Sequence, residues 1–146
     1  MKTLIPLILL LAGTSAMTYF NFKGELSCTI RPYFRYKIIV WERDDSIFTR
    51  DRKIGQSDQV QAFSSPHNYT AMAKDEKDAG KEFEIWYNIF HECTDNQQTN
   101  EYWVFIGDFP INNETQNITR HIDITNGGKK SGTTIPPTHK KAFELF

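Results

Sequence analysis

The chain has 146 residues, of which 39 % are hydrophobic, 14 % aromatic and 24 % charged, with a formal net charge of −1 at pH 7. This length fits one domain, and a chain of this size buries about two thirds of the surface that its unfolded form exposes. The near-neutral charge argues against a nucleic-acid partner and against tight binding to anionic membranes through bulk charge.

The first 16 residues are predicted to be a secretory signal peptide. Lys2 supplies a positive charge, Leu4–Ala12 is apolar apart from Pro6, and Thr14 and Ala16 place small residues where a signal peptidase reads. The apolar run is far shorter than the roughly 20 residues that span a bilayer, so a retained anchor is the less favoured alternative. We therefore expect cleavage after Ala16 and a secreted, extracellular protein with no transmembrane anchor.

Short alternating runs between turn signals predict one all-β domain over residues 17–125. The strongest run, Glu82–Cys93, is long for one strand, so we expect a bulge inside it. Residues 74–81 fit either a helical turn or a loop. The other predicted strands are Phe22–Cys28, Tyr36–Glu42, Lys53–Ser57, Gln59–Phe63, Tyr69–Ala73, Glu101–Phe109 and Asn117–Thr125. This spacing favours an antiparallel β-sandwich.

Residues 126–146 differ in composition from the rest of the chain. Gly127-Gly128, four lysines and Pro136-Pro137 predict a flexible C-terminal tail. Its last five residues, Ala142–Phe146, are apolar enough to dock elsewhere, which is the alternative.

The two cysteines, Cys28 and Cys93, predict one disulfide in a secreted protein. Closing a loop of about 65 residues would contribute roughly 4 kcal/mol by the chain-entropy model. Two buried free thiols are the alternative. A metal site is a poorer interpretation, because two cysteines supply only half of a structural zinc shell.

Three N-x-S/T sequons begin at Asn68, Asn113 and Asn117. About one would occur by chance in this composition, so the excess predicts N-glycans on solvent-facing segments. Asn113 and Asn117 are close enough that occupancy of one can exclude the other.

Four motifs in a fixed order carry a family resemblance. They are Gly24-x-Leu26-x-Cys28, then Ile38–Asp44, then Ser57-Asp58, and finally Asn88–Asp95. In this order the chain resembles the nematode transthyretin-like family of small secreted proteins over about residues 20–125. The resemblance implies a transthyretin-type (prealbumin-like) sandwich of two sheets.

The chain departs from that family at two places. Its turn Ser57-Asp58-Gln59-Val60 lacks the family's glycine, and a second cysteine pair is missing near Gln97-Gln98. We therefore identify a divergent member. The related enzymatic branch, the 5-hydroxyisourate hydrolases, uses paired histidines with an arginine and a short Tyr-Arg-Gly-Ser-type C-terminus, and this chain ends instead in Glu144-Leu145-Phe146.

Residues that often carry chemistry have structural interpretations here. His91 is predicted to be a hydrogen-bonded structural residue, with a ligand contact as the alternative. His67, His121 and His139 share no metal-ligand spacing with it. The acidic residues Asp44, Asp45, Asp51 and Asp58 lack calcium-loop spacing and fit a solvated edge.

The tryptophans Trp41, Trp86 and Trp103 each lie in a predicted strand. Core packing is the first interpretation for all three, and an exposed aromatic patch for an apolar ligand or a partner is the alternative.

These observations favour a non-enzymatic extracellular binding protein without a cofactor or metal. It would carry a small apolar ligand or bridge to a cell-surface partner, and its ligand-binding residues stay unassigned. The alternatives are a hydrolase of the 5-hydroxyisourate type and a secreted effector that binds a host protein.

Overall fold

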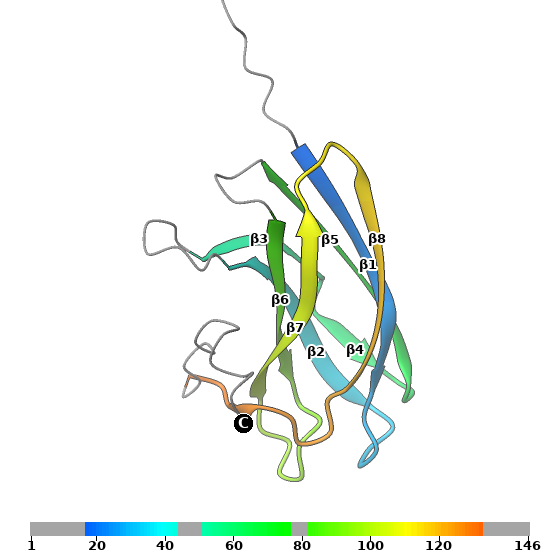
Figure 1. Ribbon diagram of the computed structural model, residues 1–146. Helices are drawn as coiled ribbons and strands as arrows, with labels where there is room; N and C mark the ends of the chain where they lie inside the picture. The colour runs from blue at the N-terminus through cyan, green and yellow to red at the C-terminus, as the bar shows by residue number, and fades with distance from the viewer. Residues whose placement is uncertain (1–16, 44–50, 77–81, 133–146) are drawn as a thin grey trace, which may run out of the picture.

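The computed structural model describes residues 17–43, 51–76 and 82–132, which form nine β-strands and no helix (Figure 1). The predicted all-β class is confirmed. The strands are β1 Met17–Ser27, β2 Phe34–Glu42, β3 Arg52–Gln56, β4 Val60–Ala62, β5 His67–Glu76, β6 Glu82–His91, β7 Asn100–Pro110, β8 Thr115–Asp123 and β9 Lys129–Lys130. The predicted signal peptide, Asp44-Asp45 and residues 133–146 lie outside the described residues.

The sheet differs in two respects from the predicted pair of antiparallel sheets. Hydrogen bonds join the strands into one nine-stranded sheet in the order β8-β1-β5-β3-β2-β6-β7-β9, with β4 paired to β2. In addition, β1 and β8 run parallel, and their register places Phe22 opposite Ile118. The sheet is therefore mixed and continuous.

A narrow connection divides this sheet into two halves. The β1 half contains β5, β1 and β8, and the β6 half contains β3, β4, β2, β6, β7 and β9. Among the described residues, the only strand-ladder pairs between the two halves are Gly55–Ala73 and Gln56–Met72, which join β3 to β5. A Cβ at position 55 would overlap the backbone oxygen of Met72, so the small glycine at this position allows the one-sheet connection.

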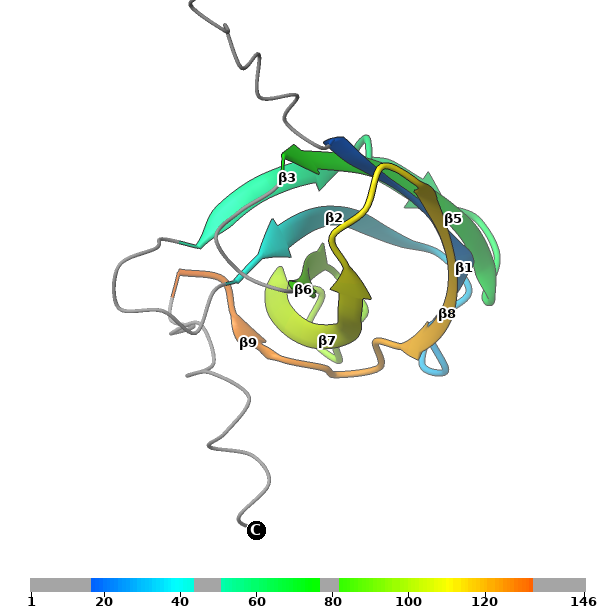
Figure 2. The same ribbon diagram turned by 45° about the horizontal axis from the view of Figure 1, so that its top comes forward.

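The curled sheet places the main core between its two halves (Figure 2). Aromatic rings meet across the interior: Phe20 lies 5.5 Å from Phe83 and Phe22 lies 5.3 Å from Tyr87, measured between ring centres. Tyr69 of β5 also contacts Tyr87, at 6.1 Å. Edge-to-face pairs of this kind add stability beyond the area that they bury. The interior is thus filled by side chains.

A side chain, instead of a strand ladder, joins β7 to β8, which is the first strand in the sheet order. Arg120 of β8 donates through Nε and Nη2 to the carbonyl oxygen of Ile106 in β7, at 3.3 and 2.8 Å. Ile106 is also the extra residue of a bulge, because the β6–β7 register shifts between Ile85 and Trp86. The sequence predicts a bulge within Glu82–Cys93. The register shift does lie along this strand, but the extra residue belongs to its neighbour β7.

The disulfide and the chain after β8 fasten one end of the molecule. Cys28 follows β1 and Cys93 follows β6, and the predicted bond between them is present, with 5.8 Å between the Cα atoms. Residues 126–132, which the composition assigned to a flexible tail, contain β9, paired with β7. The Nε2–H of His91 and the side-chain amide of Asn100 both donate to the carbonyl oxygen of Gly127, which anchors this segment.

Candidate functional site

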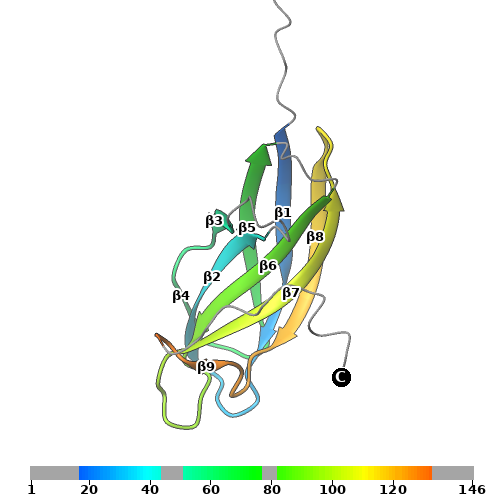
Figure 3. The ribbon, with the colours of Figure 1, turned by 60° about the vertical axis from the view of Figure 1, so that its left-hand side comes forward.

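The β6 half has a second apolar surface, on the side that faces away from the main core. In β2 and β6 the core side chains alternate with outward ones, and β7 continues the pattern as far as its bulge. These three strands lie side by side across the strands of the β1 half (Figure 3). We call this surface the aromatic face; it comprises Lys37, Ile39, Trp41, Arg43, Trp86, Asn88, Phe90, Glu101, Trp103 and Phe105.

The strand register arranges the aromatic face in rows. Lys37, Phe90 and Glu101 form the first row, Ile39, Asn88 and Trp103 the second, and Trp41, Trp86 and Phe105 the third. Successive rows are about 7 Å apart, because two strand residues separate them. Every row therefore contributes an aromatic ring to one continuous surface.

The rings pack against one another and against an arginine. The ring centres of Trp41 and Trp103 are 5.9 Å apart, and those of Trp86 and Phe105 are 5.2 Å apart. The guanidinium carbon of Arg43 lies 5.4 Å from the centre of the Trp86 ring and 5.6 Å from that of Trp103. Cation–π contacts at these distances contribute about 0.5–2 kcal/mol each. They hold the indole rings in fixed orientations.

All three tryptophans of the chain lie on this face, and the main core contains none of them among the described residues. Trp86 is 6 % exposed, whereas Trp41 and Trp103 are half-buried. None of them belongs to the main core, as core packing would require, and none is strongly exposed, as an exposed aromatic patch would require.

Polar groups are interleaved with the rings. Asn88 is 3 % exposed, and its side-chain amide donates to Glu101 at 2.8 Å. Its Oδ1 atom and the indole nitrogens of Trp41 and Trp103 have no hydrogen-bond partner among the described residues. Buried polar atoms without partners cost free energy, and functional surfaces are one place where they persist. The aromatic face is therefore chemically amphipathic.

A cleft of about 230 Å³ adjoins the first row of the aromatic face. Phe90 and Lys37 belong to both, and the other lining residues include Gln59, Thr99 and His91. Arg35 and Glu92, which also line the cleft, form an ion pair with 2.7 Å between Nη2 and Oε1. The aromatic face thus continues into a polar hollow.

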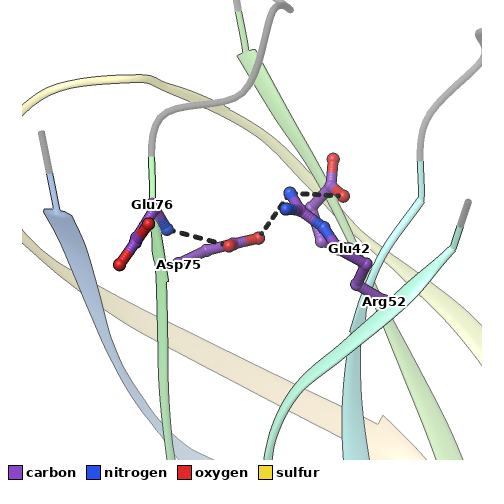
Figure 4. Close-up of polar contacts among 4 residues, drawn as sticks. All are labelled: Glu42, Arg52, Asp75 and Glu76. Atoms are coloured by element: carbon purple, nitrogen blue, oxygen red, sulfur yellow. Dashed lines mark hydrogen bonds and ion pairs between the residues drawn. The ribbon is translucent and has the colours of Figure 1, made fainter. Parts of the chain in front are cut away.

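A separate cluster of charged residues lies where β2, β3 and β5 meet (Figure 4). The Nη2 atom of Arg52 lies 3.3 Å from Oε2 of Glu42 and 3.0 Å from Oδ2 of Asp75. The Asp75 carboxylate also accepts a hydrogen bond from the backbone N–H of Glu76. Both carboxylate side chains are buried, so this cluster fixes β3 between the two halves. Sequence patterns do not predict this cluster, because its partners are far apart along the chain.

The described histidines lie in three different strands, with His67 at the start of β5, His91 at the end of β6 and His121 in β8, whereas His139 lies outside the described residues. His91 is 1 % exposed on the core side of β6, and burial lowers its pKa. This position agrees with a structural residue. The part of the chain that the structure describes contains no group of three or more His, Cys, Asp or Glu residues able to hold a metal ion. Of the acidic loop residues, Asp51 pairs with Arg43 at 2.9 Å and Asp58 is exposed.

The sequon asparagines lie away from the aromatic face. Asn68 is in β5, Asn117 is in β8 and Asn113 is in the loop before β8, and all three are exposed. Asn68 is opposite Glu25 of β1, and Asn117 is opposite Asn21. Each therefore belongs to the β1 half or to the loop that enters it.

A second exposed apolar group lies near the disulfide. Ile30, Tyr33 and Phe63 are 40 %, 60 % and 79 % exposed. Ile30 lines a wide hollow of about 590 Å³, and Tyr33 borders a smaller one of about 190 Å³. The sequence does not predict this exposed group, since isolated apolar residues in turns follow no periodic pattern.

Comparison with known proteins adds no assignment: no protein-family model matches the chain, and no curated protein matches it. Within residues 17–43, 51–76 and 82–132, no helix has the length and apolar character needed to cross a membrane.

Proposed function

We propose that this protein is a secreted, glycosylated, non-enzymatic binding module that contacts its ligand through the aromatic face. The observation that carries the proposal is the position of Trp41, Trp86 and Trp103 together on the outside of the sheet. Folding one curved sheet requires only one buried apolar side. A second aromatic surface, rimmed by polar groups, is typical of interaction sites.

The proposal includes membership of the nematode transthyretin-like family, as a divergent member with a sandwich-type fold. Two features support it beside the order of the four motifs. The halves of the sheet pack face to face around one core, and the two motif cysteines, Cys28 and Cys93, are bonded.

The location of the site narrows the two modes of binding that the sequence leaves open. A carrier that encloses an apolar molecule needs internal space, and the rings of Phe20, Phe22, Phe83 and Tyr87 occupy the interior between the halves. The aromatic face lies on the outer side of the sheet instead, where Phe90, Trp41 and Trp103 are partly exposed. It therefore favours a ligand or cell-surface partner bound on the outside of the domain.

Capture from natural material tests this function. The secreted, full-length protein would be incubated with extracellular fluid and with cell surfaces, beside Trp103→Ala and a control, Tyr19→Ala. Tyr19 is 48 % exposed in the β1 half, so the control removes an aromatic ring from the opposite side. We expect saturable capture by the native chain and the control, and at least a tenfold loss for Trp103→Ala. Equal capture by both variants would contradict the proposed site.

A further inference from the structure

We infer that the ligand of the aromatic face is a neutral, β-linked pyranose oligosaccharide; this rests on the proposed function and specifies its ligand class. The first reason is the alternation of rings and polar groups. Phe90, Trp103 and Trp41 are partly exposed and offer apolar surfaces in successive rows, while the partly exposed Lys37 and Glu101 flank Phe90. A pyranose ring has the matching chemistry, since its C–H face is apolar and its rim carries hydroxyl groups.

The shape of the site matches an extended chain. The partly exposed rings span three rows, about 13 Å from the row of Phe90 to the row of Trp41 for four strand residues, which exceeds one sugar ring. A β-linked oligosaccharide is an extended, flat ribbon, and the outer side of a sheet is an extended surface. The cleft beside Phe90, with Lys37, Gln59 and Thr99, provides hydrogen-bonding groups for a terminal sugar.

The charges on this surface favour a neutral ligand. Arg43 is paired with Asp51 at 2.9 Å, and Arg35 is paired with Glu92 at 2.7 Å. The Glu101 carboxylate accepts from Asn88. Because these charged side chains already have protein partners, and because Lys37 lies in the same row as Glu101, the surface carries no concentrated field of one sign that would select an anionic or cationic ligand.

The interleaved polar atoms disfavour a purely apolar occupant. A lipid chain laid over the rows would desolvate the partly exposed Glu101 carboxylate and Lys37 ammonium without giving them new hydrogen bonds, which costs free energy. Hydroxyl groups both donate and accept, so a sugar can satisfy such groups as it covers them.

The probes that test this inference are tetra-N-acetylchitotetraose and cellotetraose, which are β-linked, with the α-linked maltotetraose for comparison. Binding to the intact, secreted protein would be followed by tryptophan fluorescence and by saturation-transfer NMR. All three tryptophans belong to the aromatic face, so the fluorescence reports on this site. We expect saturable binding of at least one β-linked tetramer, at least tenfold tighter than that of maltotetraose.

Variants locate the binding. Trp103→Ala is expected to raise the dissociation constant of the β-linked tetramer at least tenfold, and Tyr19→Ala is expected to raise it less than twofold. If Trp103→Ala does not fold, Phe90→Ala provides the same comparison at the cleft, and the NMR experiment on the native chain identifies the protected sugar protons without any variant.

The failure of this inference is distinguishable from failure of the proposed function. No saturable binding of either β-linked tetramer up to millimolar concentration overturns the sugar class. If Trp103-dependent capture from extracellular fluid persists in the same preparation, the binding function stands with another ligand, such as a lipid, a protein or a second copy of the chain. If that capture is also absent, both proposals fall.

Discussion

The outer sides of the two halves follow the same strand alternation but carry opposite chemistry. On the β1 half, outward positions hold exposed residues such as Lys23, Asn68 and Asn117, with Tyr19 and Met72 as scattered apolar residues. On the β6 half, the equivalent positions hold the aromatic face. A sheet that packs on one core needs polar residues outside, as in the β1 half. The sequon residues Asn68 and Asn117 thus lie on the polar outer side, and the three tryptophans lie on the aromatic one.

The largest expected loss of stability comes from a substitution that forces two strands of the β1 half apart. A Cβ at Gly24 would overlap the carbonyl of Arg120 in β8, and valine would force these strands apart. We expect Gly24→Val to lower the free energy of unfolding by more than about 4 kcal/mol, measured by urea denaturation. Lys23→Ala, at the adjacent exposed position, is the control and should change it by less than about 0.5 kcal/mol. A loss in Gly24→Val as small as that in Lys23→Ala would show that β8 tolerates the displacement.

Removal of the disulfide loosens the ends of both halves at once. Cys28 belongs to the β1 half and Cys93 to the β6 half, and the bond closes a separation of 65 residues. The Cys28→Ser, Cys93→Ser double variant should lose about 4 kcal/mol of unfolding free energy by the chain-entropy model. Denaturation of the native chain with and without reductant checks the same quantity. A loss under about 1 kcal/mol would mean that the unfolded chain gains little freedom.

The ion cluster tests the connection between the halves. Arg52→Met leaves the buried carboxylates of Glu42 and Asp75 without this cation. We expect a loss of about 2 kcal/mol, below the usual cost of breaking a buried pair because the Arg52 side chain is 41 % exposed. Arg35→Met removes an exposed ion pair and is the matched control, with little expected change. Equal effects would contradict a special role for the cluster.

The smallest expected effect is the pH dependence of the free energy of unfolding that comes from His91, at the end of the molecule that carries the disulfide. Burial lowers the pKa of His91 in the folded protein, so the unfolded chain binds this proton more readily. Its contribution to stability is present above the unfolded pKa, near 6.5, and is lost as the pH falls. His91→Gln should remove this part of the acid sensitivity, at most about 1.4 kcal/mol per pH unit. Urea denaturation between pH 7.5 and 5 measures it, and identical slopes for both proteins would argue against it.

Sequence patterns predict most of the strands but not which rings meet on their outer side. The run Glu82–Cys93 is aliphatic or aromatic in one register, whereas its other register mixes Glu84 and Asn88 with Trp86 and Phe90. Alternation therefore indicates the core side, which Tyr87 occupies, but it does not say what a ring in the more polar register contacts. Trp86 faces outward and packs beside the Phe105 ring of β7, and that contact depends on pairing between strands.

The sheet connection and the ion cluster also depend on distant contacts. Parallel pairing of β1 with β8 and the closeness of Gly55 to β5 require the whole topology. Asp75 was placed in a segment that was either a helical turn or a loop, but it is the ninth residue of β5 and pairs with Arg52. The cysteine pairing was predictable because the chain has only two cysteines.

Hydroxyl-radical footprinting of the intact protein tests the central claim most directly, because both outer sides carry reactive side chains. The protein would be labelled alone and with saturating captured ligand, and oxidation would be quantified by mass spectrometry. We predict that labelling of Trp103 and Phe90 falls at least fivefold, while Met72 and Tyr19, 73 % and 48 % exposed, keep their reactivity. Protection of Met72 and Tyr19 with unchanged labelling of Trp103 and Phe90 would contradict the account.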